Sequence, residues 1–131
     1  MSLLLDTCVF LWLIWDEAPL GPAMREVLAD PDRTLFLSSV SVWEATQKHA
    51  SGKLTVRAPE GAWAHFVRQR QAHAIAPLPF DERAARHLGA LPPLHRDPFD
   101  RMLISQAIEH GLTLVTPDTN IRRYPIRTLW D

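Results

Sequence analysis

Short apolar runs alternate along the chain with longer stretches in which apolar side chains recur at helical spacing. The short runs predict buried strands, and the longer periodic stretches predict helices. Strands are predicted over residues 3–5, 34–37, 74–78, 113–116 and 127–130, the last at a sheet edge. Helices are predicted over 9–15, 22–28, about 40–51, 59–73, 81–91 and 98–110. Strands that alternate with helices indicate an α/β fold whose central parallel sheet, of about four to five strands, is covered on both faces.

Two of these helices have recognisable start signals. Either Ser39 or Ser41 can cap the third predicted helix, because serine side chains accept hydrogen bonds from the first free backbone N–H groups of a helix. Before the last helix, Asp97 is a capping residue, Pro98 suits the first helical position and Asp100 lies in the first turn. These signals fix where both helices begin relative to the strands.

Size and composition indicate one folded domain over residues 1–131, with 47% hydrophobic and 22% charged residues. The most apolar stretch, residues 9–15, is far shorter than the roughly 20 residues of a membrane-spanning helix, and no basic flank precedes it as in an export signal. The lone cysteine, Cys8, forms no internal disulfide and is interpreted as a small buried apolar residue, which suits a reducing cytoplasm. We therefore expect a cytoplasmic protein with no membrane association. A net charge of −1 gives no general support for nucleic-acid binding, so any such binding must be local.

Acidic residues from distant parts of the sequence are expected at one edge of the sheet. Asp6 directly follows the first strand, and Asp118 lies just beyond residues 113–116. The last helix runs antiparallel to the strand that follows it, so Asp97 and Asp100 begin that helix at the same edge. Glu44 lies one to two turns into the helix after the second strand. These carboxylates should converge at the carboxyl edge of the sheet, where ligands bind in open parallel folds.

Such a cluster requires a cation. Two carboxylates about 5 Å apart repel each other by roughly 3 kcal/mol at an effective dielectric constant near 20. An oxygen-rich site without cysteine or histidine ligands favours Mg²⁺ or Mn²⁺ over zinc. These ions can activate a water for attack on phosphorus and stabilise the leaving oxygen, especially as a pair. The pattern therefore favours phosphodiester hydrolysis.

Four segments together resemble the PIN domain, and in particular its VapC-type toxins: residues 3–7, 39–44, 95–107 and 112–118. The resemblance implies a three-layer α/β/α domain that cleaves RNA with Mg²⁺ or Mn²⁺. It also implies an inhibitory antitoxin partner and a homodimer. The catalytic, metal-binding acids of the family correspond in this sequence to Asp6, Glu44, Asp100 and Asp118.

Further residues are candidates for support of this site. Asp97 is interpreted chiefly as the helix cap, with metal assistance as the alternative. Thr7 and Thr116 can donate hydroxyl hydrogen bonds to the carboxylates or to metal-bound waters, or can satisfy only backbone groups. His95 is interpreted as structural, with proton donation to the leaving oxygen as the alternative. The candidate contacts to RNA phosphates are Arg96, Arg101, Arg122 and Arg123.

Two other functions fit part of the pattern. The first is a different magnesium-dependent phosphohydrolase with Asp6 as nucleophile, although such enzymes usually have a second aspartate where this chain has Cys8. The second is a non-catalytic PIN-like binding module. We expect the tryptophans to lie in the core or at a partner interface, and that interface to lie near Phe10, Leu11 and Trp12. The identities of the RNA and the antitoxin, the oligomeric state and the number of ions stay open.

Overall fold

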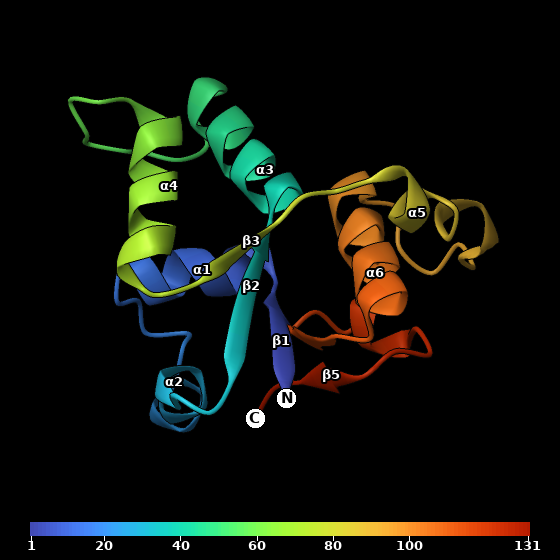
Figure 1. Ribbon diagram of the computed structural model, residues 1–131. Coiled ribbons are helices and arrows are strands. Elements are labelled where there is room, and N and C mark those ends of the chain that lie inside the picture. The colour runs from blue at the N-terminus through green and yellow to red at the C-terminus, as the bar shows by residue number, and fades with distance from the viewer.

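A five-stranded sheet forms the centre of the computed structural model, which describes residues 1–131 (Figure 1). Its strand order is β3-β2-β1-β4-β5, and every neighbouring pair is parallel. The strands are β1 (Ser2–Leu5), β2 (Thr34–Ser38), β3 (Ala76–Leu78), β4 (Thr113–Val115) and β5 (Thr128–Leu129). The central parallel sheet and the edge position of the last strand are therefore confirmed.

Six α-helices and two short 3-10 helices connect the strands. They are α1 (Thr7–Ile14), α2 (Pro22–Ala29), α3 (Ser39–Ala50), α4 (Ala62–Ala72), α5 (Glu82–Ala85) and α6 (Pro98–His110), with 3-10 turns at Leu88–Ala90 and Ile121–Arg123. None of the helices combines the length and the hydrophobicity that crossing a bilayer would require.

Alternation along the central strand divides the core between the two faces of the sheet. Leu3 and Leu5 pack with α1, α2 and α4 on one face, whereas Leu4 packs with α6 on the other. Figure 1 shows these two helical layers on either side of the strands, with α3 above their upper end. The three-layer α/β/α architecture is confirmed.

The starts of α3 and α4 differ from the sequence prediction. Ser38, not Ser39 or Ser41, caps α3, and its side chain accepts a hydrogen bond from the Val40 N–H at 3.0 Å. Helix α4 begins at Ala62, not at residue 59, because Gly61 before it has a positive φ of 94° and breaks the helical path.

The helix predicted over residues 81–91 is reduced to the single turn of α5 and the 3-10 turn at Leu88–Ala90. The backbone hydrogen bonds of this segment follow the tighter 3-10 pattern: the His87 N–H donates to the Ala84 carbonyl at 3.2 Å and the Ala90 N–H to the His87 carbonyl at 3.1 Å. The loop that follows is held by Arg101 of α6, whose guanidinium donates to the carbonyl oxygens of Leu88 and Pro92 at 3.1 Å each.

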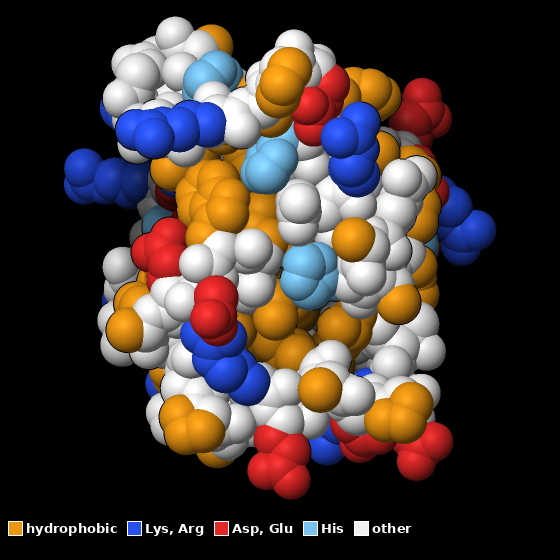
Figure 2. Space-filling model, turned by 90° about the vertical axis from the view of Figure 1, so that its left-hand side faces the viewer, with side chains coloured by type: hydrophobic (Ala, Val, Ile, Leu, Met, Phe, Trp, Pro, Cys, Tyr) orange, Lys and Arg blue, Asp and Glu red, His pale blue; other side chains and the backbone are white.

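The residues expected to form a partner interface are largely inside the protein. Phe10 and Leu11 are buried, and Trp12 is half-buried against Trp130. Figure 2 shows the face formed by α1, α2 and α4, where apolar and histidine side chains surround a hollow. The expectation for Phe10 and Leu11 is wrong because the α1 side that carries them covers the sheet.

Candidate active site

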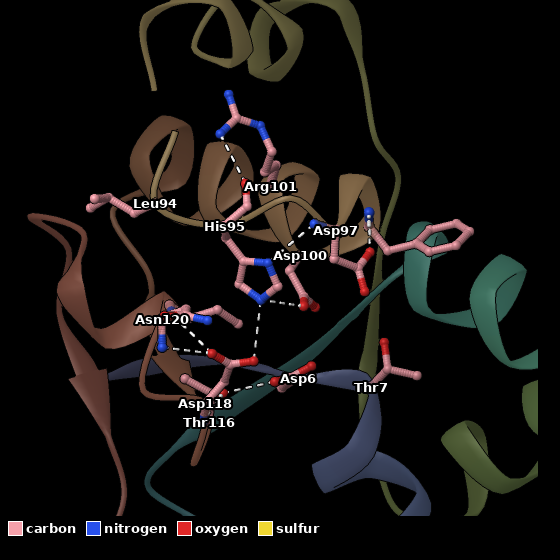
Figure 3. Close-up of polar contacts among 12 residues, drawn as sticks. Asp6, Thr7, Leu94, His95, Asp97, Asp100, Arg101, Thr116, Asp118 and Asn120 are labelled. Carbon is pink, nitrogen blue, oxygen red and sulfur yellow. Dashed lines mark hydrogen bonds and ion pairs between the residues drawn. The ribbon is translucent and has the colours of Figure 1, made fainter. Parts of the chain in front are cut away.

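Five carboxylates line one cavity of about 330 Å³ at the carboxyl edge of the sheet. They are Asp6, Glu44, Asp97, Asp100 and Asp118. The site therefore contains all the acids that the sequence placed at this edge, although they come from four separate parts of the chain. Figure 3 shows several of them turned toward one another around the His95 ring.

Asp6 is held at the junction of β1 and β4. Its backbone N–H donates to the Val115 carbonyl at 3.0 Å and continues the ladder between the two strands. The Thr116 hydroxyl donates to Asp6 Oδ2 at 2.7 Å. Asp6 is 5% exposed, so water hardly reaches its carboxylate. The hydroxyl that binds this carboxylate is neutral and supplies no positive charge.

Glu44 reaches the same cavity from α3 and is also buried. Thr7 Oγ1 donates to Glu44 Oε1 at 2.7 Å and lies 2.9 Å from Ser41 Oγ. Lys48, one helical turn further along α3, forms an ion pair with Glu44 Oε2 at 2.7 Å. Thr7 and Thr116 thus both contact carboxylates, which is one of the two roles that the sequence left open for them.

The start of α6 brings two aspartates and a histidine together. Asp97 caps the helix as predicted, because its Oδ1 accepts the Phe99 N–H at 2.9 Å. Asp100 lies in the first turn, where its Oδ2 is 2.9 Å from His95 Nε2. The same nitrogen lies 3.2 Å from Asp118 Oδ2, so one imidazole links two acids (Figure 3).

Asp118 is fixed by the backbone that follows it. Its Oδ1 accepts hydrogen bonds from the N–H groups of Asn120, at 2.8 Å, and Ile121, at 3.0 Å. Its own N–H donates to Thr116 Oγ1 at 3.0 Å. The two carboxylate oxygens of Asp118 therefore have different partners. Oδ1 accepts hydrogen bonds from the backbone of the loop after β4, and Oδ2 faces His95 and the other acids.

Burial and mutual repulsion change the acidity of the central pair. Burial raises the pKa of Asp6 to about 6, an effect that the Thr116 hydroxyl opposes and the Glu44 charge reinforces. Burial also raises the pKa of Asp100 to about 8, with further contributions from Asp6 and Asp97. Both groups lack the positive partners that would favour their charged forms.

The outer groups of the cluster respond differently. Partial burial opposes ionisation of Asp118, but hydrogen bonds from Ile121, His95 and Asn120 outweigh it and lower its pKa. Burial likewise opposes the charged form of Lys48, but the hydrogen bond to Glu44 raises its pKa above the ordinary value. Lys48 is the only basic side chain that lines the cavity, so five acids share one lysine.

This arrangement fits a hard divalent cation. The available donors are carboxylate oxygens, which Mg²⁺ and Mn²⁺ prefer. The pKa values of Asp6 and Asp100 are raised by burial first and then by repulsion from neighbouring acids, and a cation among the carboxylates would offset that repulsion. Three potential ligand atoms, one each from His95, Asp100 and Asp118, lie within 4.8 Å of one another. The residues present therefore fit such an ion beside Asp100 and Asp118, whereas Asp6 and Glu44 line the same cavity but do not belong to this group of three.

The four arginines proposed as phosphate contacts have different surroundings. Arg101 turns away from this role, because its guanidinium donates to backbone carbonyls of the preceding loop and to the Tyr124 hydroxyl at 3.2 Å. The Arg101 side chain therefore holds the preceding loop against α6, and this does not agree with the predicted phosphate contact. Arg96, Arg122 and Arg123 are exposed, and the latter two lie in the 3-10 turn after Asp118.

Two residues of the site had weaker signals in the sequence. His95 was expected to be structural, yet it contacts two acids directly. Its position two residues before the helix cap could have indicated this, because the chain turns back there over the first helical turn. Lys48 was not singled out, although it stands four residues after Glu44, the spacing of a helical ion pair.

Comparison with known proteins gives a family match and a set of similar folds. The model of the PIN domain family matches residues 3–127. No curated protein has significant sequence similarity to the chain. Among solved structures, a chain of VapBC2 from Rickettsia felis, bound to a DNA fragment from the promoter, superposes with a TM-score of 0.74 at 19% identity over 100% of both chains.

Two further structures have the same fold. A chain of DNA-bound VapBC from Salmonella typhimurium gives a TM-score of 0.69 at 23% identity, over 98% of this chain and 97% of that one. A chain of VapBC-5 from Mycobacterium tuberculosis, a member of the VapBC family of toxin-antitoxin systems, gives 0.58 at 22% identity, over 98% and 95%. At these identities the similarity establishes the fold alone.

Proposed function

Since the chain belongs to the PIN domain family, we propose that it is an endoribonuclease that depends on Mg²⁺ or Mn²⁺. The observation that carries the proposal is the cavity in which five carboxylates share a single lysine. Clustered acids that lack counter-charges destabilise a fold unless a cation binds among them. The proposed metal ligands and catalytic residues are Asp6, Glu44, Asp100 and Asp118.

The side chains of the site have separable tasks in this reaction. A bound divalent cation supplies water activation and stabilises charge on the leaving oxygen. Thr116 and Thr7 hold the carboxylates of Asp6 and Glu44 in fixed orientations through hydrogen bonds of 2.7 Å. Such preorganisation matters because a group that is already oriented loses little further freedom when the substrate binds.

Binding of RNA requires positive charge beside this negative cavity. Lys48 and Lys53 line an adjoining hollow of about 250 Å³ that shares Glu44 with the acidic cavity. We assign phosphate contacts to these lysines and to the exposed Arg96, Arg122 and Arg123. Local contacts of this kind are compatible with a net charge of −1.

The test is RNA cleavage by freshly purified protein without a partner, with Mg²⁺ or Mn²⁺ and with EDTA. We expect cleavage with either ion, no cleavage with EDTA and no cleavage by Asp6→Asn. If the ion binds but no structured or single-stranded RNA is cut, the endoribonuclease proposal is wrong and a non-catalytic binding module is favoured. A trapped phosphoenzyme on Asp6 would instead indicate the phosphohydrolase with an aspartyl nucleophile.

We further propose that this ribonuclease is the toxin of a toxin-antitoxin pair and forms a homodimer. The VapBC assemblies among the similar folds support a cognate antitoxin as partner. Induced expression of the unaltered chain should arrest growth, and Asp6→Asn should not. Growth arrest by both forms would contradict a toxicity that depends on RNA cleavage, and light scattering of the purified protein tests the dimer.

A further inference from the structure

His95 occupies the centre of the acidic cluster, and its two ring nitrogens face opposite kinds of partner. Nδ1 lies 3.1 Å from the backbone N–H of Asp97, which can only donate. Nε2 lies 2.9 Å from Asp100 Oδ2 and 3.2 Å from Asp118 Oδ2. The ring side chain is 13% exposed, so water does not readily replace these partners.

This surrounding selects one tautomer of the imidazole. Because the Asp97 N–H donates to Nδ1, that nitrogen must offer its lone pair, and the ring proton of the neutral form lies on Nε2. The Nε2–H group then donates to Asp118 Oδ2 at 3.2 Å, and Asp100 Oδ2 lies 2.9 Å from the same nitrogen. If Nε2 instead bound a cation through its lone pair, the proton would have to lie on Nδ1 and face the Asp97 N–H.

The loop around His95 resists such a change. The N–H of His95 donates to the Tyr124 hydroxyl at 3.0 Å, and that hydroxyl also accepts from Arg101 at 3.2 Å. Tyr124 in turn donates to the Pro92 carbonyl at 2.7 Å. Tyr124 is buried, so the backbone that carries the imidazole is anchored to the core.

Asp118 adds an independent constraint. Its Oδ1 already accepts two backbone N–H groups, so Oδ2 is the oxygen that remains for a cation, and this oxygen is the one that faces Nε2. We propose that His95 is a positioning residue and not a metal ligand: its Nε2–H holds Asp118 Oδ2 and Asp100 Oδ2 together for the cation. This inference rests on the metal site of the proposed function.

Two substitutions separate the tasks of the two ring nitrogens. In His95→Gln the amide nitrogen reaches about as far as Nε2 and can donate to the aspartates. In His95→Asn the side chain reaches only about as far as Nδ1, so its oxygen can accept the Asp97 N–H but its amide does not reach the aspartates. Mn²⁺ affinity, measured by calorimetry without RNA, is the first readout. Loss of a group that orients metal ligands typically weakens metal binding about 10- to 100-fold.

We expect His95→Asn to bind Mn²⁺ at least about tenfold more weakly and His95→Gln to recover most of the loss. His110→Gln, an exposed site at the end of α6, is the matched control and should bind as the unaltered protein does. If His95→Asn retains the affinity and His95→Gln loses it, His95 serves only the turn before α6 and the proposal is wrong. Circular dichroism shows that each variant is folded.

A second readout uses the unaltered protein. In ¹H–¹⁵N spectra of the imidazole, Nε2 should carry the proton both without ions and with saturating Mg²⁺. Transfer of the proton away from Nε2 on addition of Mg²⁺ would identify His95 as a ligand and overturn the proposal. Neither measurement uses RNA, so Mn²⁺ binding with the expected pattern but no RNA cleavage would reject only the proposed function. Absence of Mn²⁺ binding would reject both.

Discussion

The two ends of α6 hold acidic residues in opposite circumstances. At its first turn Asp100 is surrounded by further acids, and burial followed by repulsion from Asp6 raises its pKa to about 8. In its last turns Glu109 binds Arg86 at 2.8 Å and His87 at 3.0 Å, with Arg83 at 3.4 Å. The hydrogen bond from His87 lowers the pKa of Glu109, although burial opposes this.

This is the difference that we expect between a structural acid and a proposed metal ligand. Glu109 has its positive partners within the chain, so its ion pairs link α5 to α6 and need nothing from solution. Asp100 has one imidazole and other carboxylates as neighbours but no lysine or arginine, and burial and these acids raise its pKa. Perturbed acidity in a cavity indicates function more strongly when the chain itself supplies no counter-charge.

The largest effect should follow from Asp100→Asn. The substitution removes a proposed metal ligand but keeps the size of the side chain, and we expect RNA cleavage to fall at least about 100-fold, as when one electrostatic contributor to a transition state is lost. Initial rates at saturating Mg²⁺ measure the loss. Cleavage within a factor of about three of the unaltered rate would remove Asp100 from the proposed mechanism.

The second prediction concerns pH. A raised pKa in the folded state means that stability is full below the ordinary value of 3.8 and declines as pH rises through about 6 for Asp6 and about 8 for Asp100. The ion-free protein should therefore melt at a lower temperature near about pH 8.5 than near about pH 5.5. Because the cation binds the ionised carboxylates, saturating Mg²⁺ should raise the melting temperature most at the higher pH.

Melting curves at both pH values, with and without Mg²⁺, measure this effect. We expect a difference of several degrees, since about 1 kcal/mol shifts the melting temperature of a domain of this size by about 2–8 °C. Glu109 cannot produce the same trend, because its lowered pKa makes it lose stabilisation as the solution becomes more acidic. A Mg²⁺ effect of equal size at both pH values would contradict the assignment to Asp6 and Asp100.

A smaller effect is expected from Lys48→Met. Lys48 is the one basic side chain in the acidic cavity and is half-exposed, so we assign it an RNA phosphate contact. Removal of one such contact should reduce the slope of log affinity against log salt by about 0.7 for single-stranded RNA. Binding to RNA by the Asp6→Asn form, titrated at several salt concentrations, measures the slope. Arg86→Met, which affects only the Glu109 cluster, should leave it unchanged.

How far the sequence alone predicts this molecule depends on whether a feature is local or follows from topology. The strands were predicted from short apolar runs, and the cap at Asp97 followed from the residues beside it. The acidic edge was predictable because parallel strands bring their carboxyl ends together. The contacts of Arg101 were not predictable, because its partners are carbonyl groups of a loop whose path depends on packing against α6.

His95 shows the same limit within the site. The sequence places it next to the helix start, but its contact with Asp118 joins residues that are 23 positions apart. That contact depends on how the loop after β4 meets the loop before α6, which no local pattern specifies. The acids could be predicted because each lies just after a strand or in the first two turns of a helix, whereas the contacts of the residue that links two of them are visible only in the folded structure.

The smallest change in melting temperature should follow from Glu109→Gln. Its direction should be opposite to that of Asp100→Asn. The substitution leaves Arg83, Arg86 and His87 without their anion, so we expect a slightly lower melting temperature at neutral pH and RNA cleavage unchanged. Asp100→Asn should do the reverse in ion-free protein. The Asp100 carboxyl, with a pKa of about 8 in the folded protein, must stay protonated there at neutral pH although it ionises in the unfolded chain, so its replacement by a neutral amide raises the melting temperature while cleavage is lost. Melting curves of the two variants in EDTA, beside their cleavage rates in Mg²⁺, measure both signs. If both variants lower the melting temperature in EDTA, Asp100 is a structural acid like Glu109, and the distinction between the two ends of α6 is wrong.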